Sequence, residues 1–308
     1  MGLLGSDPAA APTRRPRRWY LVALAAILGV ALLVTLVVVH FAPRTRYAAT
    51  LPRPAGPTAP AGPTAPAAEA PIPVPPAPAG LPVIDYGPAP KGFPADPDPL
   101  STIRLAEGLH PTRKVPAYDA PGGRPRAFIA PTISGVQLTM PIVDRRSGWV
   151  AVLLPSANRT IGWLPPGGWQ TVPLRDLVVV ARDTYKLYWL RDDKLVRSWS
   201  VTLGIPATPT PLGRTFILGR SALPGAVYAE TDVFALGSVP DRPDAIPAGL
   251  KGAHIGIHTW YHDRSLGKKD SDGCIRLTRS GQRLLLDELV PGTEVVVVDR
   301  FREPAPTT

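Results

Sequence analysis

The sequence contains a single cysteine, Cys274, among its 308 residues. A lone thiol excludes an internal disulfide, so this chain cannot be a disulfide-stapled secreted fold. An unpaired cysteine in an exported chain is commonly either a liability or a nucleophile. A buried structural cysteine is the alternative, but glycine precedes Cys274 and polar residues surround it, which favours the nucleophile.

Paired, closely spaced metal ligands are also lacking. His254, His258 and His262 are spaced by four residues, which suits a metal site on a helix, whereas this segment alternates like a strand. We therefore expect no metal and no cofactor. Basic patches interleaved with aromatic residues are lacking too, so nucleic acid is not an expected partner. The net charge of +10 is consistent with solubility, membrane topology or attraction to anionic lipid or wall polymer.

Charge is missing altogether from residues 19–41, an apolar run that is long enough to cross a bilayer core of about 30 Å. Four arginines precede the run and two follow it, which favours a cytoplasmic N-terminus. A cleaved signal peptide would have a shorter apolar region and a small-residue cleavage site. We predict a cytoplasmic basic tail (1–18), a single transmembrane helix (19–41) and an extracytoplasmic remainder on the cell-wall side of the membrane.

Proline and alanine dominate residues 42–101, in which the sequence Ala-Gly-Pro-Thr-Ala-Pro occurs at 55–60 and again at 61–66. Such a segment cannot bury a core, and it favours extended, partly polyproline II conformations. We predict a linker here, either a stalk or a disordered tether. Both would hold the folded part away from the membrane.

Short apolar runs alternate with turn residues over 102–168, which predicts a small all-β unit. Gly148-Trp149-Val150, followed by Gly162-Trp163-Leu164, resembles the pattern of bacterial SH3-like domains. The resemblance implies a small barrel that binds the wall or packs against its neighbour. Trp149 and Trp163 are expected in the barrel core, with a ligand groove as the alternative.

Residues 174–300 predict a second, larger β domain with one short helix, followed by a tail at 301–308. Strands are expected at 177–181 and 185–190 as a hairpin, then at 194–202, 215–218 and 294–299. The helix is expected over 278–289, capped by Thr278 or Ser280 and ended by Pro291-Gly292. The fold class is therefore mainly β.

The residues around Cys274 suit covalent acyl transfer. A strand at 254–258 would place His254, Gly256 and His258 on one face, and the charged loop at 261–270 keeps the thiol accessible. A thiol nucleophile needs either a lowered pKa or an adjacent base, and an imidazole can provide both. Gly273 lets its own N–H and that of Cys274 approach an oxyanion. Arg276 could hold a carboxylate.

The segment from His258 to Ser271-Asp272-Gly273-Cys274-Ile275-Arg276-Leu277 resembles the active-site signature of the YkuD-type L,D-transpeptidases. Residues 204–216 resemble the Thr-Pro-x-Gly-x-Phe stretch of that family. The resemblance implies an enzyme that acts on peptidoglycan, with a donor tetrapeptide stem and an acceptor amine. It implies a thioester on Cys274, release of D-Ala and a 3→3 cross-link, with His258 as base and Gly273 at the oxyanion site.

The site departs from the family pattern at two positions. Asp272 stands where the family usually has histidine, and Thr259 stands where it often has glycine. We expect Asp272 to point away or to pair with a cation, because a carboxylate beside the thiol would raise the thiol pKa. The residues expected at the substrate are Arg276, Ser271, Asp272, Thr259, Trp260 and His254. Two other functions stay open: an L,D-carboxypeptidase, in which water resolves the thioester, and a non-catalytic peptidoglycan-binding protein.

Overall fold

The computed structural model describes residues 70–303, except for 86, 88–89, 158, 223–227, 229–230 and 238–254. The chain divides into two units, Met1–Ala65 and Pro66–Thr308, and the described residues all belong to the second unit. The predicted basic tail, the apolar run at 19–41 and the first part of the linker lie outside the described residues. Among the helices of the described part, none is long and apolar enough to span a membrane.

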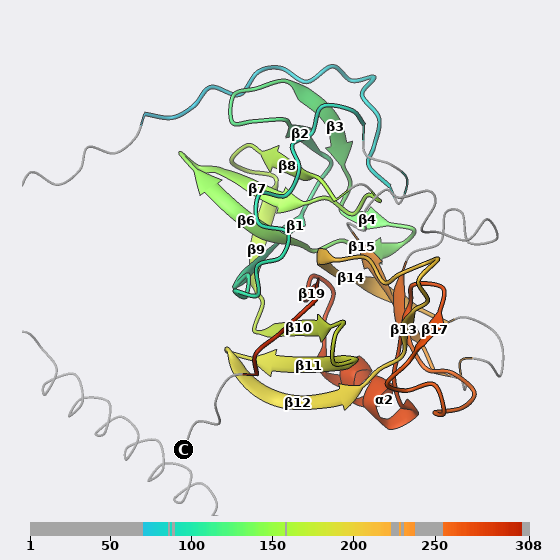
Figure 1. The fold of residues 1–308 in the computed structure, drawn as a ribbon. Coiled ribbons are helices and arrows are strands. Elements are labelled where there is room, and N and C mark those ends of the chain that lie inside the picture. The colour runs from blue at the N-terminus through green and yellow to red at the C-terminus, as the bar shows by residue number, and fades with distance from the viewer. Residues whose placement is uncertain are drawn as a thin grey trace, which may run out of the picture. The chain divides into compact units, whose positions relative to one another are not determined.

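Within Pro66–Thr308 the described residues form two β units. The smaller β unit is a seven-stranded antiparallel sheet in the order β3-β2-β8-β7-β6-β1-β9 (Figure 1). Its strands are β1 (Glu107–Pro111), β2 (Val115–Tyr118), β3 (Pro125–Ile129), β6 (Met140–Arg146), β7 (Trp149–Leu153), β8 (Ile161–Leu164) and β9 (Trp169–Pro173), with a separate pair β4 (Thr132–Ile133) and β5 (Val136–Gln137). Ser147 and Gly148 join β6 to β7, and both have positive φ, as a tight two-residue hairpin requires. Trp149 is fully buried, as the sequence predicted for the core.

The sheet of the smaller unit continues beyond residue 168, where the sequence analysis ended this unit. Strand β9 follows a Pro-Pro-Gly-Gly turn and pairs with β1 along its whole length, from Glu107 with Pro173 to Pro111 with Trp169. The half-exposed, polar pattern of β9 gave no core signal, because one face of this edge strand is open to solvent. The smaller unit therefore extends to Pro173.

An eight-stranded mixed sheet forms the larger unit, in the order β12-β11-β10-β19-β14-β15-β16-β18. Its strands are β10 (Asp176–Ala181), β11 (Lys186–Arg191), β12 (Lys194–Ser200), β14 (Gly213–Ser221), β15 (Val233–Gly237), β16 (Gly256–His258), β18 (Ile275–Arg276) and β19 (Glu294–Val298), beside a parallel pair β13 (Leu203–Gly204) and β17 (Lys269–Ser271). The predicted hairpin is confirmed as β10 with β11, and the last predicted strand as β19.

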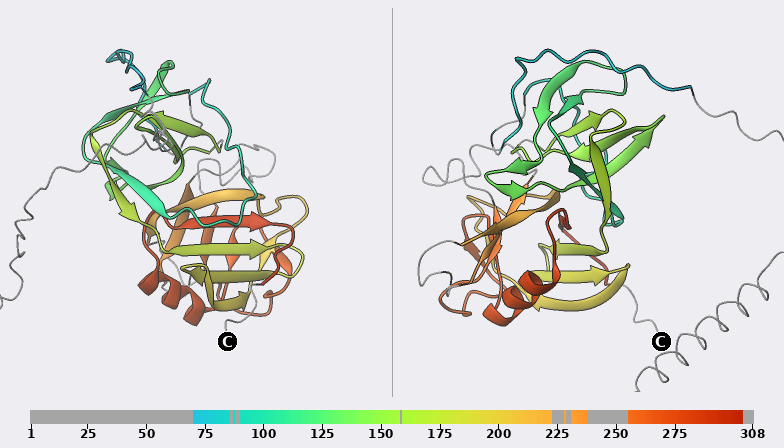
Figure 2. Two further views of the ribbon diagram at one scale, coloured as in Figure 1. Left: turned by 90° about the vertical axis from the view of Figure 1, so that its left-hand side faces the viewer. Right: turned by 180° about the vertical axis from the view of Figure 1, so that it is seen from behind.

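Helix α2 (Arg279–Glu288) is the predicted short helix, and it lies against one face of this sheet (Figure 2). The Thr278 hydroxyl caps it by accepting a hydrogen bond from the Gly281 N–H at 3.1 Å. Leu285 and Leu286 pack in one cluster with Val178 and Val180, while Leu177 and Val179 pack on the opposite face of the sheet. Burial on both faces explains why these strands are continuously apolar.

The described end of the predicted linker is not a free tether. The described residues between 70 and 101 lie along the smaller unit, and the early part of their trace follows β2 and β3 (Figure 1). Pro82 and Ile84 exchange main-chain hydrogen bonds with Phe128, and Ile161 donates to the Pro94 carbonyl at 2.9 Å. The stalk prediction therefore does not extend to this part of the chain, because its prolines dock against strands.

The two β units of the described region share a core and a buried ion pair. Phe216 and Leu218 of β14 belong to the same apolar cluster as the buried residues of the smaller unit. The Arg214 Nε donates to Asp96 Oδ2 at 2.9 Å, and both side chains are almost fully buried. The Glu294 carboxylate accepts a hydrogen bond from the Leu105 N–H at 2.9 Å. The smaller unit is therefore joined firmly to the larger sheet.

Candidate active site

Two short strands bring the predicted site residues together. Strands β16 and β18 are parallel, with Ile257 beside Ile275 and His258 beside Arg276. Side chains alternate along a strand, so His258, Cys274 and Arg276 lie on one face, while Ile257 and Ile275 are fully buried on the other. The register makes the imidazole and the thiol diagonal neighbours across Gly256, which has no side chain to separate them.

Cys274 as a residue has intermediate exposure, while its thiol is largely buried. Burial is the largest influence on its pKa and raises it, and the nearby Asp272 carboxylate raises it further. A hydrogen bond with the Gly256 backbone and the positive charge of Arg276 act in the opposite direction. The raised pKa favours the protonated thiol, so a nucleophilic role for Cys274 would require an adjacent base.

His258 is arranged to serve as that base. Its Nδ1 lies 2.6 Å from the Thr259 carbonyl oxygen. A carbonyl can only accept, so Nδ1 carries the hydrogen and Nε2 keeps its lone pair. Burial lowers the pKa of His258 to about 4, the Thr259 hydrogen bond opposes this shift, and Arg276 adds to it. The imidazole is therefore neutral, and able to take a proton, at neutral pH.

Gly273 adopts a conformation that a residue with a side chain rarely takes, with φ of +105°. A Cβ here would lie 2.8 Å from the Ile255 Cδ1, and the Thr208 and Pro209 carbonyl oxygens lie just beyond, at 3.6 and 3.8 Å. The Ile205 N–H also donates to the Ser271 carbonyl at 2.9 Å. The two predicted motifs, at 204–216 and 271–277, therefore meet at Gly273.

The Arg276 guanidinium lies over an aromatic ring. Its guanidinium carbon lies 3.7 Å from the centre of the Trp260 ring, and its Nη1 donates to the Asp270 carbonyl at 2.5 Å. Burial lowers the pKa of Arg276, while the neighbouring Cys274, Asp270 and Asp272 favour its charge. Its buried Nε has no hydrogen-bond partner within the described part of the chain. A positively charged side chain with one unused N–H donor thus lies near the thiol.

Several predicted substrate contacts prove to be engaged in the protein itself. The Ser271 hydroxyl donates to the Cys274 carbonyl at 2.6 Å, and the fully buried Thr259 hydroxyl donates to the Tyr228 carbonyl at 2.5 Å. Asp272 is exposed, but its carboxylate still raises the pKa of the Cys274 thiol. Trp260 is half-buried at the site, and His254 lies outside the described residues.

Sequence reasoning missed the main-chain carbonyls of the site. The carbonyls of Thr259, Thr208 and Pro209 shape it, and a carbonyl has no signature in a residue pattern. The Tyr228 ring, 5.1 Å from the His258 ring and nearly perpendicular to it, forms another wall of the site.

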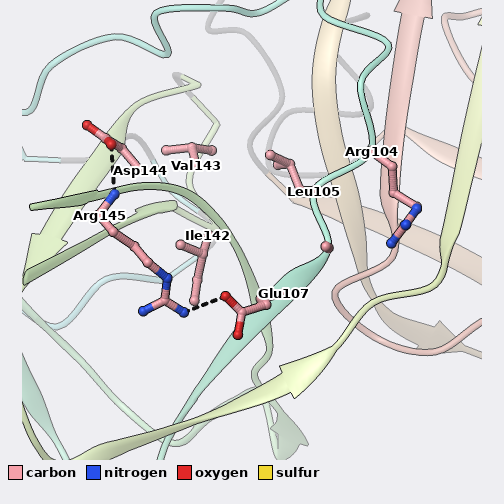
Figure 3. Close-up of a pocket in the computed structure, with 8 residues that line it drawn as sticks. Arg104, Leu105, Glu107, Ile142, Val143, Asp144 and Arg145 are labelled. Carbon is pink, nitrogen blue, oxygen red and sulfur yellow. Dashed lines mark hydrogen bonds and ion pairs between the residues drawn. The ribbon is translucent and has the colours of Figure 1, made fainter. Parts of the chain in front are cut away.

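A separate groove of about 360 Å³ lies in the smaller unit. It is lined by residues 104–107 and 142–145, as Figure 3 shows, and Cys274 is not among them. Its charged groups are satisfied within the protein. Arg145 pairs with Glu107 at 2.7 Å, and Arg104 pairs with Asp193 at 3.1 Å. No cysteine, serine or histidine lines the groove, and its carboxylates Glu107 and Asp144 are already hydrogen-bonded to Arg145.

The larger β unit is similar to known proteins in sequence. Residues 175–297 match the model of the YkuD family, the L,D-transpeptidase catalytic domain. The chain is 31% identical over 128 residues to a Bacillus licheniformis protein named for L,D-transpeptidase YkuD, covering 41% of this chain and 67% of the relative. A Bacillus subtilis protein named for L,D-transpeptidase YqjB is 29% identical, covering 44% of this chain and 79% of the relative.

Among solved structures, an L,D-transpeptidase from Mycobacterium smegmatis is similar, with a TM-score of 0.32 and 19% identity. The similarity covers 46% of this chain and 73% of that one.

Proposed function

Because the chain belongs to the YkuD family of L,D-transpeptidases, we propose that it is a peptidoglycan transpeptidase with Cys274 as its nucleophile. One observation carries the proposal. The His258 imidazole shares a strand face with Cys274, and its hydrogen bond to the Thr259 carbonyl leaves Nε2 free to accept a proton. This is the nucleophile, base and orienting group that covalent catalysis requires.

The first half-reaction forms a thioester. The Cys274 sulfur attacks the carbonyl carbon of the third residue of a donor tetrapeptide, and its proton passes to His258 Nε2. The negative oxygen of the tetrahedral intermediate accepts hydrogen bonds from the N–H groups of Gly273 and Cys274. The bond to D-Ala then breaks, and the imidazolium returns the proton to the departing amine.

The second half-reaction resolves the thioester. The amine of a neighbouring stem attacks the thioester carbonyl and gives a proton to His258, and the sulfur leaves and is reprotonated. The product is a 3→3 cross-link. Arg276 supplies a fixed positive charge for a substrate carboxylate, supported by its stacking on Trp260 and its unpaired Nε.

The location of the reaction is part of the proposal. The uncharged run at 19–41, with its preceding arginines, supports an anchor with the described domains on the cell-wall side. The tryptophan pattern of the smaller unit supports an SH3-like role beside the enzyme, either in wall binding or in packing. Both rest on sequence alone.

The test is intact-mass analysis of the full chain after incubation with purified tetrapeptide stems, with Cys274→Ala as the matched control. We expect an adduct equal to the donor acyl group, with release of one D-Ala, and neither in the control. Cross-linked dimers identify an acceptor amine, whereas free tripeptide alone identifies a carboxypeptidase. A folded chain that forms no adduct and releases no D-Ala is instead a non-catalytic wall-binding protein.

A further inference from the structure

A short proline-rich segment at the start of the described region has an unusually restricted backbone. Between residues 71 and 78, in the sequence Pro-Ile-Pro-Val-Pro-Pro-Ala-Pro, every residue either is proline or precedes one. Proline fixes φ near −65°, and a residue before proline is driven to extended or polyproline II conformations. Such a segment has few N–H groups to offer. It can be recognised mainly through its carbonyl oxygens and its side chains.

Two aromatic side chains of the smaller unit donate to those carbonyls. The Trp149 indole N–H donates to the Ile72 carbonyl at 3.3 Å, and the Tyr118 hydroxyl donates to the Pro75 carbonyl at 2.6 Å. The acceptors are three residues apart. Polyproline II repeats every three residues, so carbonyls at this spacing point the same way. The two rings meet edge to face, with centroids 5.0 Å apart.

The burial pattern follows this period from residue 72 to residue 76. Ile72 and Pro75 are half-buried, whereas Pro73, Val74 and Pro76 are exposed. The period ends there, since Ala77 is half-buried and Pro78 is exposed. Residues 72–76 therefore present one edge to the aromatic pair and turn their other edges to solvent.

A glycine allows the segment to lie this close. Gly122 has a positive φ of 68°, and a Cβ there would lie 2.7 Å from the Ile72 Cγ2 and 3.5 Å from the Pro73 carbonyl oxygen. The turn that contains Gly122 is stabilised by an ion pair between Asp119 and Arg126, at 2.6 Å. Tyr118, Gly122 and Trp149 thus form one continuous contact surface, which we call the aromatic face.

We propose that the aromatic face is a recognition site for polyproline II peptides, and that its ligand is the chain's own segment Ile72–Pro76. The docked segment is a releasable end of the linker. At about 3.1 Å per residue, release of residues 71–79 would lengthen the free tether by roughly 30 Å. The inference is independent of the transpeptidase chemistry, because none of its residues lies at the Cys274 site.

The test follows the Trp149 indole N–H by NMR hydrogen exchange, in the full chain labelled with ¹⁵N-tryptophan and assigned with Trp149→Phe. The release variant combines Pro73→Gly, Pro75→Gly and Pro76→Gly. The matched control, Pro57→Gly with Pro60→Gly and Pro63→Gly, removes as many prolines upstream. We expect at least tenfold faster exchange in the release variant only. A synthetic peptide of residues 70–80 should slow that exchange again, with saturation.

Equal exchange in the release variant and the control would overturn the proposal, and so would failure of the peptide to restore protection. Thermal unfolding of each variant shows whether it has folded. If the release variant unfolds early, Tyr118→Phe replaces it, because this change removes only the hydroxyl donor and keeps the ring. Tyr118→Phe should speed exchange at Trp149 with little change in thermal unfolding, and unchanged exchange would again overturn the proposal.

Discussion

At the residue scale, a main-chain carbonyl orients the histidine. The Thr259 carbonyl accepts from His258 Nδ1, and the Thr259 hydroxyl in turn donates to the Tyr228 carbonyl. A carbonyl cannot be deleted by substitution, but its position depends on that hydroxyl. We expect Thr259→Val to lower kcat for D-Ala release about tenfold, with KM nearly unchanged, because misplacing a catalytic group costs rate. Thr259→Ser should restore kcat, and equal kcat in the two variants would contradict this role.

The pKa of His258 predicts how activity depends on pH. The base must be neutral, and burial lowers its pKa from 6.5 to about 4. Activity should therefore persist as the pH falls through 6.5 and decline only near 4. The pH profile of kcat/KM for D-Ala release measures this, because it reports the groups of the free enzyme. An acid limb between about 6 and 7 would show that the imidazole is not buried as described.

The proposed role of Gly273 at the oxyanion site can be tested by comparison with Gly267, a second glycine with a positive φ. Gly273→Ala should cost about 1–3 kcal/mol of stability through backbone strain, and its Cβ would press on Ile255. Gly267→Ala has similar strain, since φ is +79°, but nothing lies within 4 Å of its Cβ. Urea unfolding should show both losses, whereas mass analysis should show loss of the thioester in Gly273→Ala alone. Thioester formation by both variants would remove Gly273 from the oxyanion site.

At the element scale, some parts of the fold were predictable and others were not. Strands β10, β11 and β19 could be predicted from their continuous apolar runs, and α2 from its clear N-cap, because these signals are local in sequence. The pairing of β16 with β18 was not readable, since it joins two very short strands across the charged loop at 261–270. The sequence placed His258 and Cys274 as partners by residue type, while their shared face depends on that parallel register.

The register depends on the apolar side of the strand pair, where Ile275 is fully buried. Ile275→Ala should cost about 2–5 kcal/mol, because the cavity left behind adds to the lost burial. It should also lower the rate of thioester formation, since Cys274 is the next residue. Val196→Ala on the edge strand β12, where the side chain is 48% exposed, is the matched control and should cost far less. Urea unfolding of both variants measures the difference, and equal losses would contradict the assigned packing.

At the scale of the whole molecule, the sequence predicted two β domains and left open whether the smaller one packs against the larger. In the described region the two β units share a common core. Asp96 comes from the predicted linker and Arg214 from the larger sheet, and their buried pair leaves no trace in either local pattern. Removing one partner of such a pair leaves an uncompensated buried charge. The two predicted domains therefore follow one another along the chain but share one core in the described region.

Beside this pair, Glu294 makes the stability of the whole molecule depend on pH. Burial raises its pKa from 4.5 to about 7, against the opposing effects of Leu105 and Arg214. The folded chain then holds a proton that the unfolded chain releases. This stabilisation is complete below pH 4.5 and is lost as the pH rises through 7. Glu294→Gln should remove that decline. His258 has the opposite trend, so each protein is compared with itself by urea unfolding at about pH 5 and pH 8. An equal change in stability between these pH values in both proteins would contradict the burial of a protonated Glu294.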